Sequence, residues 1–258
     1  MQLLISVANA READAAIAGG ADIVDAKEPL AGPLGAVLPA VLREIVEAVA
    51  LRTPVSVALG DAPVGRFRDG EADRMVLLRA RDAARDGADY VKLGFAGTPS
   101  AERAAAFLAA ARRGAHAIGP HVKVVAVAYA DAAAAKSVPH DTLLDVAVQV
   151  GCAGVLIDTF DKGAGGLFDQ LPFREIARWV QRTERAGLIP ALAGKLDAEG
   201  VATARTLGAH IAGVRGAACR HGRNGQVSPL YVRLLREATI GLKMPHPGLA
   251  AEWPLVGR

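Results

Sequence analysis

The stretch GGADIVDAKEPLAG, residues 19 to 32, contains the unit that repeats along this chain of 258 residues. A glycine ends a helix, a short β-type run follows, and charged residues stand where that run ends. A glycine in the same place, between a helix and a strand, precedes later β-type runs, in DGADY at 86–90, VGCAG at 150–154 and LGAH at 207–210. A glycine at such a point can take the left-handed conformation that terminates a helix. The repetition predicts helices that alternate with parallel strands.

Working outward from this stretch, the whole chain divides into strand-then-helix units. Eight β-type runs are QLLISVA, ADIVDAK, PVSVALG, ADYVKLGF, VKVVAVAYAD, GVLIDTF, IPALAG and HIAGVRG. Segments with apolar residues at helical spacing lie between them, at 11–19, 38–50, 71–86, 100–117, 140–150, 173–186, 197–207 and 228–240. Eight such units predict an α/β fold, a single (β/α)8 TIM barrel over residues 1–240.

An open, doubly wound sheet is the alternative fold. Against it, the first strand and helix are joined by VANARE, residues 7–12, which has none of the glycines that a dinucleotide-binding turn requires. Residues 241–258 form a Pro- and Gly-rich C-terminal extension of unknown role. Such a tail could wrap the barrel, contact a neighbouring subunit or form an ordinary surface extension. We expect a homo-oligomer.

Composition narrows the class of protein. Hydrophobic residues make up 52% and aromatic residues 4%, so the core must consist mainly of Ala, Val, Leu and Ile, as in parallel α/β proteins. The formal net charge is only +3, and no basic run with interleaved aromatics occurs, which argues against nucleic-acid binding. The N-terminus lacks a basic leader, and no apolar stretch is long enough to cross a bilayer. We therefore expect a cytoplasmic protein without a membrane or nucleic-acid partner.

Metal and redox chemistry find no support in the sequence. The six histidines lack metal-ligand spacing, and we expect no metal and no cofactor. Cys152 and Cys219 form no CxxC motif, and we expect both to be small buried side chains.

Lysine is rare in this chain and stands at the ends of β-type runs. Of 30 basic residues only seven are lysine, and three of these are Lys27, Lys92 and Lys162. Arginine cannot lose its proton, whereas a desolvated lysine beside other charges can attack a carbonyl and form an imine. The pattern therefore indicates amine chemistry at the mouth of a barrel.

Charged residues from alternate strands should converge there. Asp25 and Lys27 share one face of the second strand, Lys92 and Asp158 end the fourth and sixth, and Lys162 follows in the next loop. Any single Asp–Lys pair could simply close the barrel top as a salt bridge. Several charges in a half-buried mouth are more often tolerated at a working site, and clustered ammonium groups depress one another's pKa.

The loops after the seventh and eighth strands predict a phosphate site. Gly194 and Lys195 end the seventh strand, and Arg215, Gly216 and Ala217 end the eighth. Barrels commonly hold phosphate there with backbone amides that glycine exposes. The alternative is that both glycines only permit tight turns.

Two further features adjoin the expected mouth. The glycines at 163, 165 and 166 suggest a mobile loop that carries Lys162 toward the site. Tyr129 and Asp131, at the end of the fifth strand, could supply an acid or a hydrogen bond, or could orient a neighbour.

These residues lie in motifs that resemble a specific family. GGADIVDAKEPLAGPLGA, GADYVKLG, AYADA, IDTFDKGAGGLFD, ALAGKL and GVRGAAC are similar to segments of the (5-formylfuran-3-yl)methyl phosphate synthases of methanofuran biosynthesis, in order from residue 2 to about 240. The resemblance implies a barrel enzyme, a lyase, that condenses two molecules of glyceraldehyde 3-phosphate into a phosphorylated furan aldehyde with loss of phosphate and water. It implies that Lys27 is the Schiff-base lysine and Lys92 the proton acceptor. Asp25, Asp158 and Lys162 match further charged active-site positions of that family.

Three other functions would also require some of these features, the lysines at the barrel mouth or the phosphate site. A Schiff-base aldolase acting on another phosphorylated sugar needs everything except the final aromatisation. A pyridoxal-phosphate enzyme also needs a lysine and a phosphate cup. A non-catalytic barrel could bind a phosphorylated metabolite without forming an imine.

Overall fold

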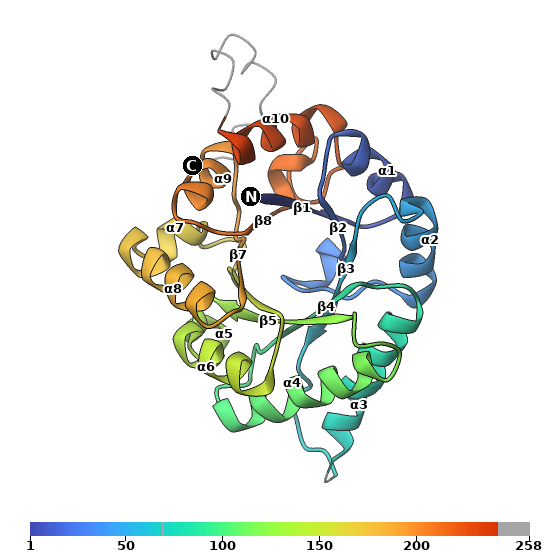
Figure 1. Ribbon diagram of the computed structural model, residues 1–258, viewed down its shortest axis with the longest axis vertical. Helices are drawn as coiled ribbons and strands as arrows, with labels where there is room; N and C mark the ends of the chain where they lie inside the picture. The colour runs from blue at the N-terminus through green and yellow to red at the C-terminus, as the bar shows by residue number, and fades with distance from the viewer. Residues whose placement is uncertain (69, 242–258) are drawn as a thin grey trace.

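Eight parallel strands close into a barrel with helices around it (Figure 1). The structure, a computed structural model, describes residues 1–68 and 70–241. Because β1 pairs with both β2 and β8, the sheet has no open edge, which confirms the predicted TIM barrel and excludes the doubly wound alternative. The strands are β1 Gln2–Val7, β2 Ile23–Ala26, β3 Val55–Asp61, β4 Tyr90–Gly94, β5 Lys123–Tyr129, β6 Gly154–Asp158, β7 Ile189–Leu192 and β8 Ile211–Val214.

Helices occupy each of the eight segments in which the sequence predicts them. Short helices also follow β2, β5, β6 and β8, and these were not predicted, because one turn carries no readable period. All but the first residue of the predicted C-terminal extension lies outside the described residues. The helices are α1 Ala10–Ala18, η1 Pro29–Ala31, α2 Pro39–Val49, α3 Glu71–Arg85, α4 Ala101–His116, α5 Ala132–Ala135, α6 His140–Val150, α7 Leu167–Gln170, α8 Phe173–Arg185, α9 Ala198–Thr206, η2 Gly216–Ala218 and α10 Pro229–Ile240.

The glycines that end these helices have the predicted left-handed backbone conformation. Gly20, Gly87, Gly151 and Gly208 take φ values of 92°, 100°, 76° and 88°. A residue with a side chain rarely adopts this left-handed region, so glycine is the residue that lets each helix turn directly into the next strand.

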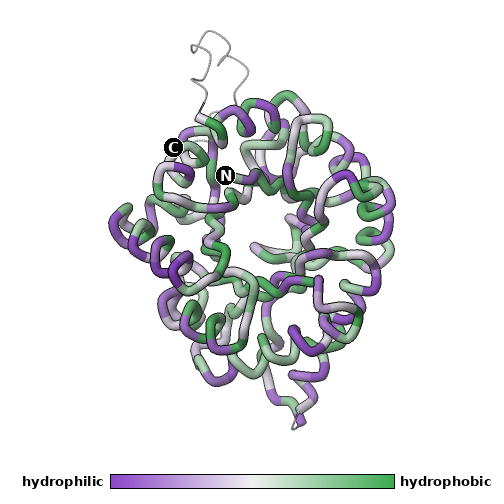
Figure 2. The backbone as a smooth tube through the Cα atoms, in the orientation of Figure 1, coloured by the Kyte–Doolittle hydropathy of each residue, from purple (hydrophilic) through white to green (hydrophobic). Residues whose placement is uncertain are grey.

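Apolar side chains fill two concentric layers. The larger layer lies between the barrel and its helices, and the smaller one fills the barrel interior. Parallel strands are therefore buried on both faces, which accounts for their continuous apolar runs. Figure 2 shows the same division, with hydrophobic residues along the central strands and hydrophilic ones on the outer helices.

The barrel interior is filled unevenly. Val127, Tyr129 and Leu156 contribute large side chains from β5 and β6, whereas β7 contributes Ala191 and the partly buried Ile189, and Ala193 follows directly after β7. Small residues such as Ala191, Ala193 and Gly213 line the space that becomes the candidate site.

Both cysteines are buried and unpaired. Burial raises the pKa of the Cys152 thiol to about 12 and that of the Cys219 thiol to about 11. Both therefore pack as small apolar groups, as the sequence predicts. Over the part of the chain that the structure describes, no helix is long and apolar enough to span a bilayer.

Candidate active site

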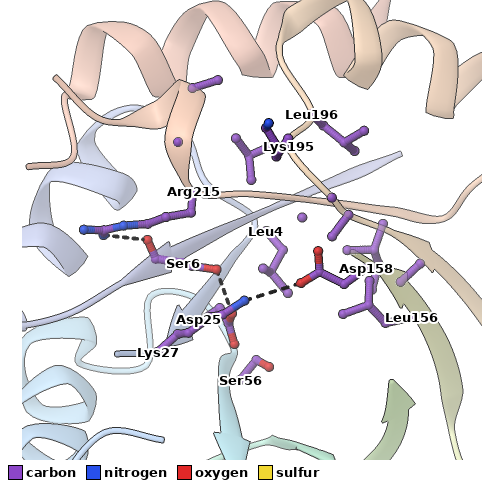
Figure 3. Close-up of a pocket in the computed structure, with 18 of the residues that line it drawn as sticks. Leu4, Ser6, Asp25, Lys27, Ser56, Leu156, Asp158, Lys195, Leu196 and Arg215 are labelled. Carbon is purple, nitrogen blue, oxygen red and sulfur yellow. Dashed lines mark hydrogen bonds and ion pairs between the residues drawn. The ribbon is translucent and has the colours of Figure 1, made fainter. Parts of the chain in front are cut away.

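A cavity of about 460 Å³ opens at the carboxyl ends of the strands. In barrels of this architecture the catalytic residues lie at the carboxyl ends of the strands. All ten residues predicted for the charged cluster and the phosphate site line this one cavity, some of them labelled in Figure 3. They are Asp25, Lys27, Lys92, Asp158, Lys162, Gly194, Lys195, Arg215, Gly216 and Ala217.

Three lysines and two aspartates form one buried charge network. Lys92 Nζ lies 2.7 Å from Asp25 Oδ1, and Lys27 Nζ lies 3.5 Å from Asp158 Oδ2. Lys162 Nζ approaches the other oxygen of Asp158 at 2.6 Å. Figure 3 shows Lys27 and Asp158 reaching toward each other across the cavity. Because ammonium groups outnumber carboxylates, one lysine can become neutral without leaving an unpaired carboxylate.

Lys27 is the lysine that the surroundings favour as a neutral amine. Burial lowers its pKa first, and the neighbouring ammonium groups of Lys92 and Lys162 lower it further. The Asp158 carboxylate opposes them, and the resulting pKa is about 8 instead of 10.5. At pH 7 about a tenth of the molecules would therefore carry a neutral amine at this position.

Asp158 is held as a carboxylate. Burial alone would raise its pKa, but the ammonium groups of Lys162 and Lys27 outweigh burial and hold the pKa well below its usual range. The backbone N–H of Thr159 also donates to Asp158 Oδ1 at 2.8 Å. Asp158 is thus a permanent anion that two lysines share.

Lys162 reaches this network from the loop between β6 and α7. Its ammonium donates to Asp158 and, on Thr159, to the backbone oxygen at 2.5 Å and the hydroxyl at 3.1 Å. Asp131 holds the same loop, because its carboxylate accepts the backbone N–H groups of Phe160 and Asp161 at 2.7 and 2.8 Å. The sequence left two roles open for Asp131, an acid and a group that orients a neighbour. These hydrogen bonds agree with the second role. The predicted mobility of the loop stays a prediction.

Tyr129 likewise orients a neighbour. Its hydroxyl donates to Asp61 Oδ1 at 2.8 Å, and that oxygen also accepts the backbone N–H of Ala96. Burial and the Asp61 carboxylate raise the pKa of Tyr129. Because Tyr129 does not line the cavity, an acid role is not supported.

The predicted phosphate residues lie at the β7–β8 side of the cavity. Gly194 and Lys195 have φ values of 106° and 55°, so the backbone turns sharply after β7. A Cβ at Gly194 would lie 3.0 Å from the Thr159 Cγ2 atom, whereas at Gly216 the nearest atom would be 3.8 Å away. Gly194 thus serves the close packing of two loops, and Gly216 has no comparable steric requirement.

The Arg215 side chain is fully occupied within the protein. It donates to the backbone oxygens of Ser6 (3.0 Å), Arg223 (3.0 Å) and Gly225 (2.9 Å), and to both carboxylate oxygens of Glu12. A guanidinium has five N–H donors, and these contacts use all of them. The side chain therefore joins β1, α1 and the loop after β8, and any phosphate contact at residue 215 would fall to the backbone.

Arg223, in the same loop, is a cavity residue that the sequence reasoning missed. Its Nη2 donates to the backbone oxygens of Pro29 and Gly32 at 3.3 and 2.8 Å, which bridges the mouth between the loops after β8 and β2. Its position between glycines in RHGRNG, after the eighth strand, was the available signal. Ser6 and Ser56 were also missed, because a lone serine within a strand has no distinctive pattern.

The cations of the cavity divide into two groups. Lys27, Lys92, Lys162 and Arg215 each contact a carboxylate. Lys195 and Arg223 have no carboxylate partner within residues 1–68 and 70–241. Both stand on the loops after β7 and β8, so an anionic ligand would be attracted to that side.

No group of three or more His, Cys, Asp or Glu side chains among the described residues is arranged to hold a metal ion. The cavity offers amines, carboxylates and hydroxyls instead. This combination suits covalent chemistry on a carbonyl compound that also carries an anionic group.

The amino-acid sequence matches one protein family over almost the whole barrel. The model of the 4-HFC-P synthase family matches residues 3–236. A protein of Methanopyrus kandleri named (5-formylfuran-3-yl)methyl phosphate synthase is 40% identical over 239 residues, which covers 92% of this chain and 98% of that protein. A protein of Methanocaldococcus jannaschii with the same name is 36% identical over 239 residues, with 92% and 99% covered.

Solved structures with the same architecture are more distant in sequence. Phosphoribosyl anthranilate isomerase of Thermus thermophilus superposes with a TM-score of 0.60 at 16% identity, covering 94% of this chain and 100% of that one. For 3-hexulose-6-phosphate synthase the TM-score is 0.59 at 17% identity, with 92% and 99% covered. At such identities the likeness extends to the fold alone.

Proposed function

The chain belongs to the 4-HFC-P synthase family, and we propose that it forms (5-formylfuran-3-yl)methyl phosphate from two molecules of glyceraldehyde 3-phosphate, as a lyase of methanofuran biosynthesis. The observation that carries the proposal is Lys27, a buried lysine with a pKa of about 8. Its cavity also contains two cations, Lys195 and Arg223, that have no carboxylate partner among the described residues. The first property suits imine formation, and the second suits phosphorylated substrates.

Lys27 starts the proposed reaction as a neutral amine. Its nitrogen bonds to the aldehyde carbon of one triose phosphate, and loss of water yields an imine. The protonated imine keeps a positive charge, which the Asp158 carboxylate at 3.5 Å would stabilise. The imine makes the proton on the next carbon acidic.

Lys92 is the proposed acceptor of that proton. It lies 2.7 Å from Asp25, so the two groups can pass a proton between them without creating an isolated buried charge. The resulting enamine attacks the aldehyde of the second triose. Release of the Lys27 amine from the imine carbon, with loss of water and of one phosphate, then yields the free aromatic product. Asp25 and Lys162 are placed for the proton transfers, and the Asp158 carboxylate would stabilise the cationic intermediates.

The β7–β8 side of the cavity would hold the phosphate groups. Lys195 and Arg223 supply the charges, and the backbone at Gly194 and at 215–217 supplies hydrogen-bond donors. Two substrate molecules bring two phosphates, which agrees with two cations that no carboxylate of the described residues contacts.

Incubation with glyceraldehyde 3-phosphate tests the proposal. We expect a furan-type ultraviolet absorbance, release of inorganic phosphate, and, with borohydride, a triose adduct on the peptide that contains Lys27. Lys27→Arg should abolish all three, because guanidinium forms no imine. Lys136→Arg, at an exposed position outside the cavity, is the matched control and should keep them.

The assay also separates the alternatives. A reversible aldol product without phosphate release would point to an aldolase and refute the synthase. Binding without any borohydride-trapped mass at Lys27 would indicate a non-catalytic barrel. A visible imine absorbance in the purified protein would indicate a pyridoxal-phosphate enzyme.

A further inference from the structure

Ser56 lines the cavity with a hydroxyl that forms no hydrogen bond to any described residue. The residue lies in β3 and is only 1% exposed. No hydrogen-bond partner for Ser56 Oγ exists among the residues that the structure describes, although it is fully buried. A buried hydroxyl without a partner costs stability, so a chain that keeps one at the floor of a cavity indicates a partner from outside the protein.

The neighbours of Ser56 show what that partner must approach. Ser6, Asp25 and Ser56 pair in register across β1, β2 and β3, so they form one row. Ser6 Oγ donates to Asp25 Oδ2 at 2.9 Å, and Asp25 Oδ1 contacts the Lys92 ammonium. Figure 3 shows the two serines on opposite sides of Asp25. Asp25 thus has both oxygens engaged, and Ser56 is left facing the cavity.

Packing does not explain the hydroxyl. Ala58, two residues further along β3, Ala191 on β7 and Ala193 just after β7 belong to the same interior cluster, so an alanine would suit position 56. Three other buried polar atoms in the described part of the chain lack a hydrogen bond: Asp25 Oδ1, His140 Nε2 and Trp179 Nε1. Asp25 and His140 instead form ion pairs with Lys92 and Glu175, and Trp179 lies in the outer helix α8, away from the cavity. Ser56 therefore differs from both its apolar neighbours and the other unpartnered groups.

We propose that Ser56 contacts the substrate, and that its hydroxyl hydrogen-bonds the C2 hydroxyl of the triose phosphate that is attached to Lys27. The inference rests on the proposed function. In that reaction Lys92 removes the proton from C2, and Ser56 lies in the row of Asp25, the partner of Lys92. A hydrogen bond to the C2 hydroxyl would orient the C2 proton toward the base, and it would select trioses over aldehydes that lack this hydroxyl.

Two substrates and two variants test the contact. Borohydride-trapped adduct on the Lys27 peptide is measured against ligand concentration, with glyceraldehyde 3-phosphate and with 3-oxopropyl phosphate, which lacks the C2 hydroxyl. We expect Ser56→Ala to weaken adduct formation with glyceraldehyde 3-phosphate by about tenfold and to leave that with 3-oxopropyl phosphate within about twofold. Ser137→Ala removes a buried hydroxyl outside the cavity and should change neither.

Protein stability supplies the second measurement. Because the hydroxyl has no partner among the described residues, the melting temperature of Ser56→Ala should equal or exceed that of the unchanged protein. Equal adduct formation by Ser56→Ala and the unchanged protein with both ligands would overturn the inference. An equal loss with both ligands, or a lower melting temperature, would overturn it as well, because Ser56 would then act through the fold. Failure of the unchanged protein to form any glyceraldehyde 3-phosphate adduct would refute the proposed function itself, and this inference with it.

Discussion

The rate at which Lys27 forms its covalent adduct should follow the fraction of neutral amine at that residue. With a pKa of about 8 instead of 10.5, about 1% of the side chains are neutral at pH 6, about a tenth at pH 7 and half at pH 8. The amine is the reactive form, so the rate should rise about tenfold from pH 6 to pH 7 and level off above pH 8. At pH 7 the neutral fraction is about 300-fold larger than for an ordinary exposed lysine.

Two variants should move the midpoint of this pH profile in opposite directions. Asp158 raises the pKa of Lys27, so Asp158→Asn should shift the midpoint to lower pH by about one unit. Lys162 lowers that pKa and also engages Asp158, so Lys162→Met should shift the midpoint to higher pH by about one unit. Opposite shifts are specific to electrostatic coupling, because general damage to the site would lower the rate without moving the midpoint.

The assay measures the rate of cyanoborohydride-trapped adduct at the Lys27 peptide between pH 6 and 9.5, read by mass. This readout reports imine formation and does not require the later steps in which Asp158 and Lys162 have proposed roles. Lys27→Arg provides the background, and Lys136→Arg should reproduce the unchanged profile. A midpoint near 10 in the unchanged protein, or shifts of the same sign in both variants, would refute the electrostatic account of Lys27.

Three further predictions concern the surrounding structure. Glu12→Gln leaves the Arg215 guanidinium buried without a counter-charge and should lower the free energy of unfolding in urea by about 3–5 kcal/mol; a loss below about 1 kcal/mol would contradict the structural role of this pair. Gly194→Ala forces a side chain at φ 106° and should cost about 1–3 kcal/mol in the same assay, whereas Gly216→Ala should stay within about 0.5 kcal/mol of the unchanged protein. Arg223→Met removes an unpaired cation from the cavity and should raise the KM for glyceraldehyde 3-phosphate by about tenfold at constant ionic strength; an unchanged KM would remove Arg223 from phosphate binding.

Much of the fold could be predicted because the determining interactions are local and periodic. A glycine such as Gly87 or Gly151 ends its helix through its own backbone freedom, and a strand buried on both faces needs a continuous apolar run. Both leave a mark in a few consecutive residues. The short helices α5 and α7 escaped prediction because their four residues lie in loops whose contacts are tertiary.

That the charged side chains of the site lie close together could also be predicted, from their positions at the ends of strands. Lys27, Lys92 and Asp158 stand at strand ends, and barrel closure brings strand ends together regardless of the details of packing. Spacing did not indicate which lysine would form the proposed imine; the family resemblance implied Lys27, and the lowered pKa of that buried side chain agrees with it. The sequence alone thus determined the architecture, the residue types at the mouth and their approximate meeting place.

Only the tertiary structure shows which hydrogen-bond partners the side chains at the mouth have. Arg215 and Arg223 are the same residue type eight positions apart. All the guanidinium donors of Arg215 are hydrogen-bonded within the protein, whereas Arg223 donates to the backbone through Nη2 and also lines the cavity. The unpartnered hydroxyl of Ser56 is likewise visible only once its neighbours are placed. The reason is that hydrogen bonding and desolvation depend on distances of a few tenths of an ångström between groups far apart in the chain, and a linear pattern does not encode those distances.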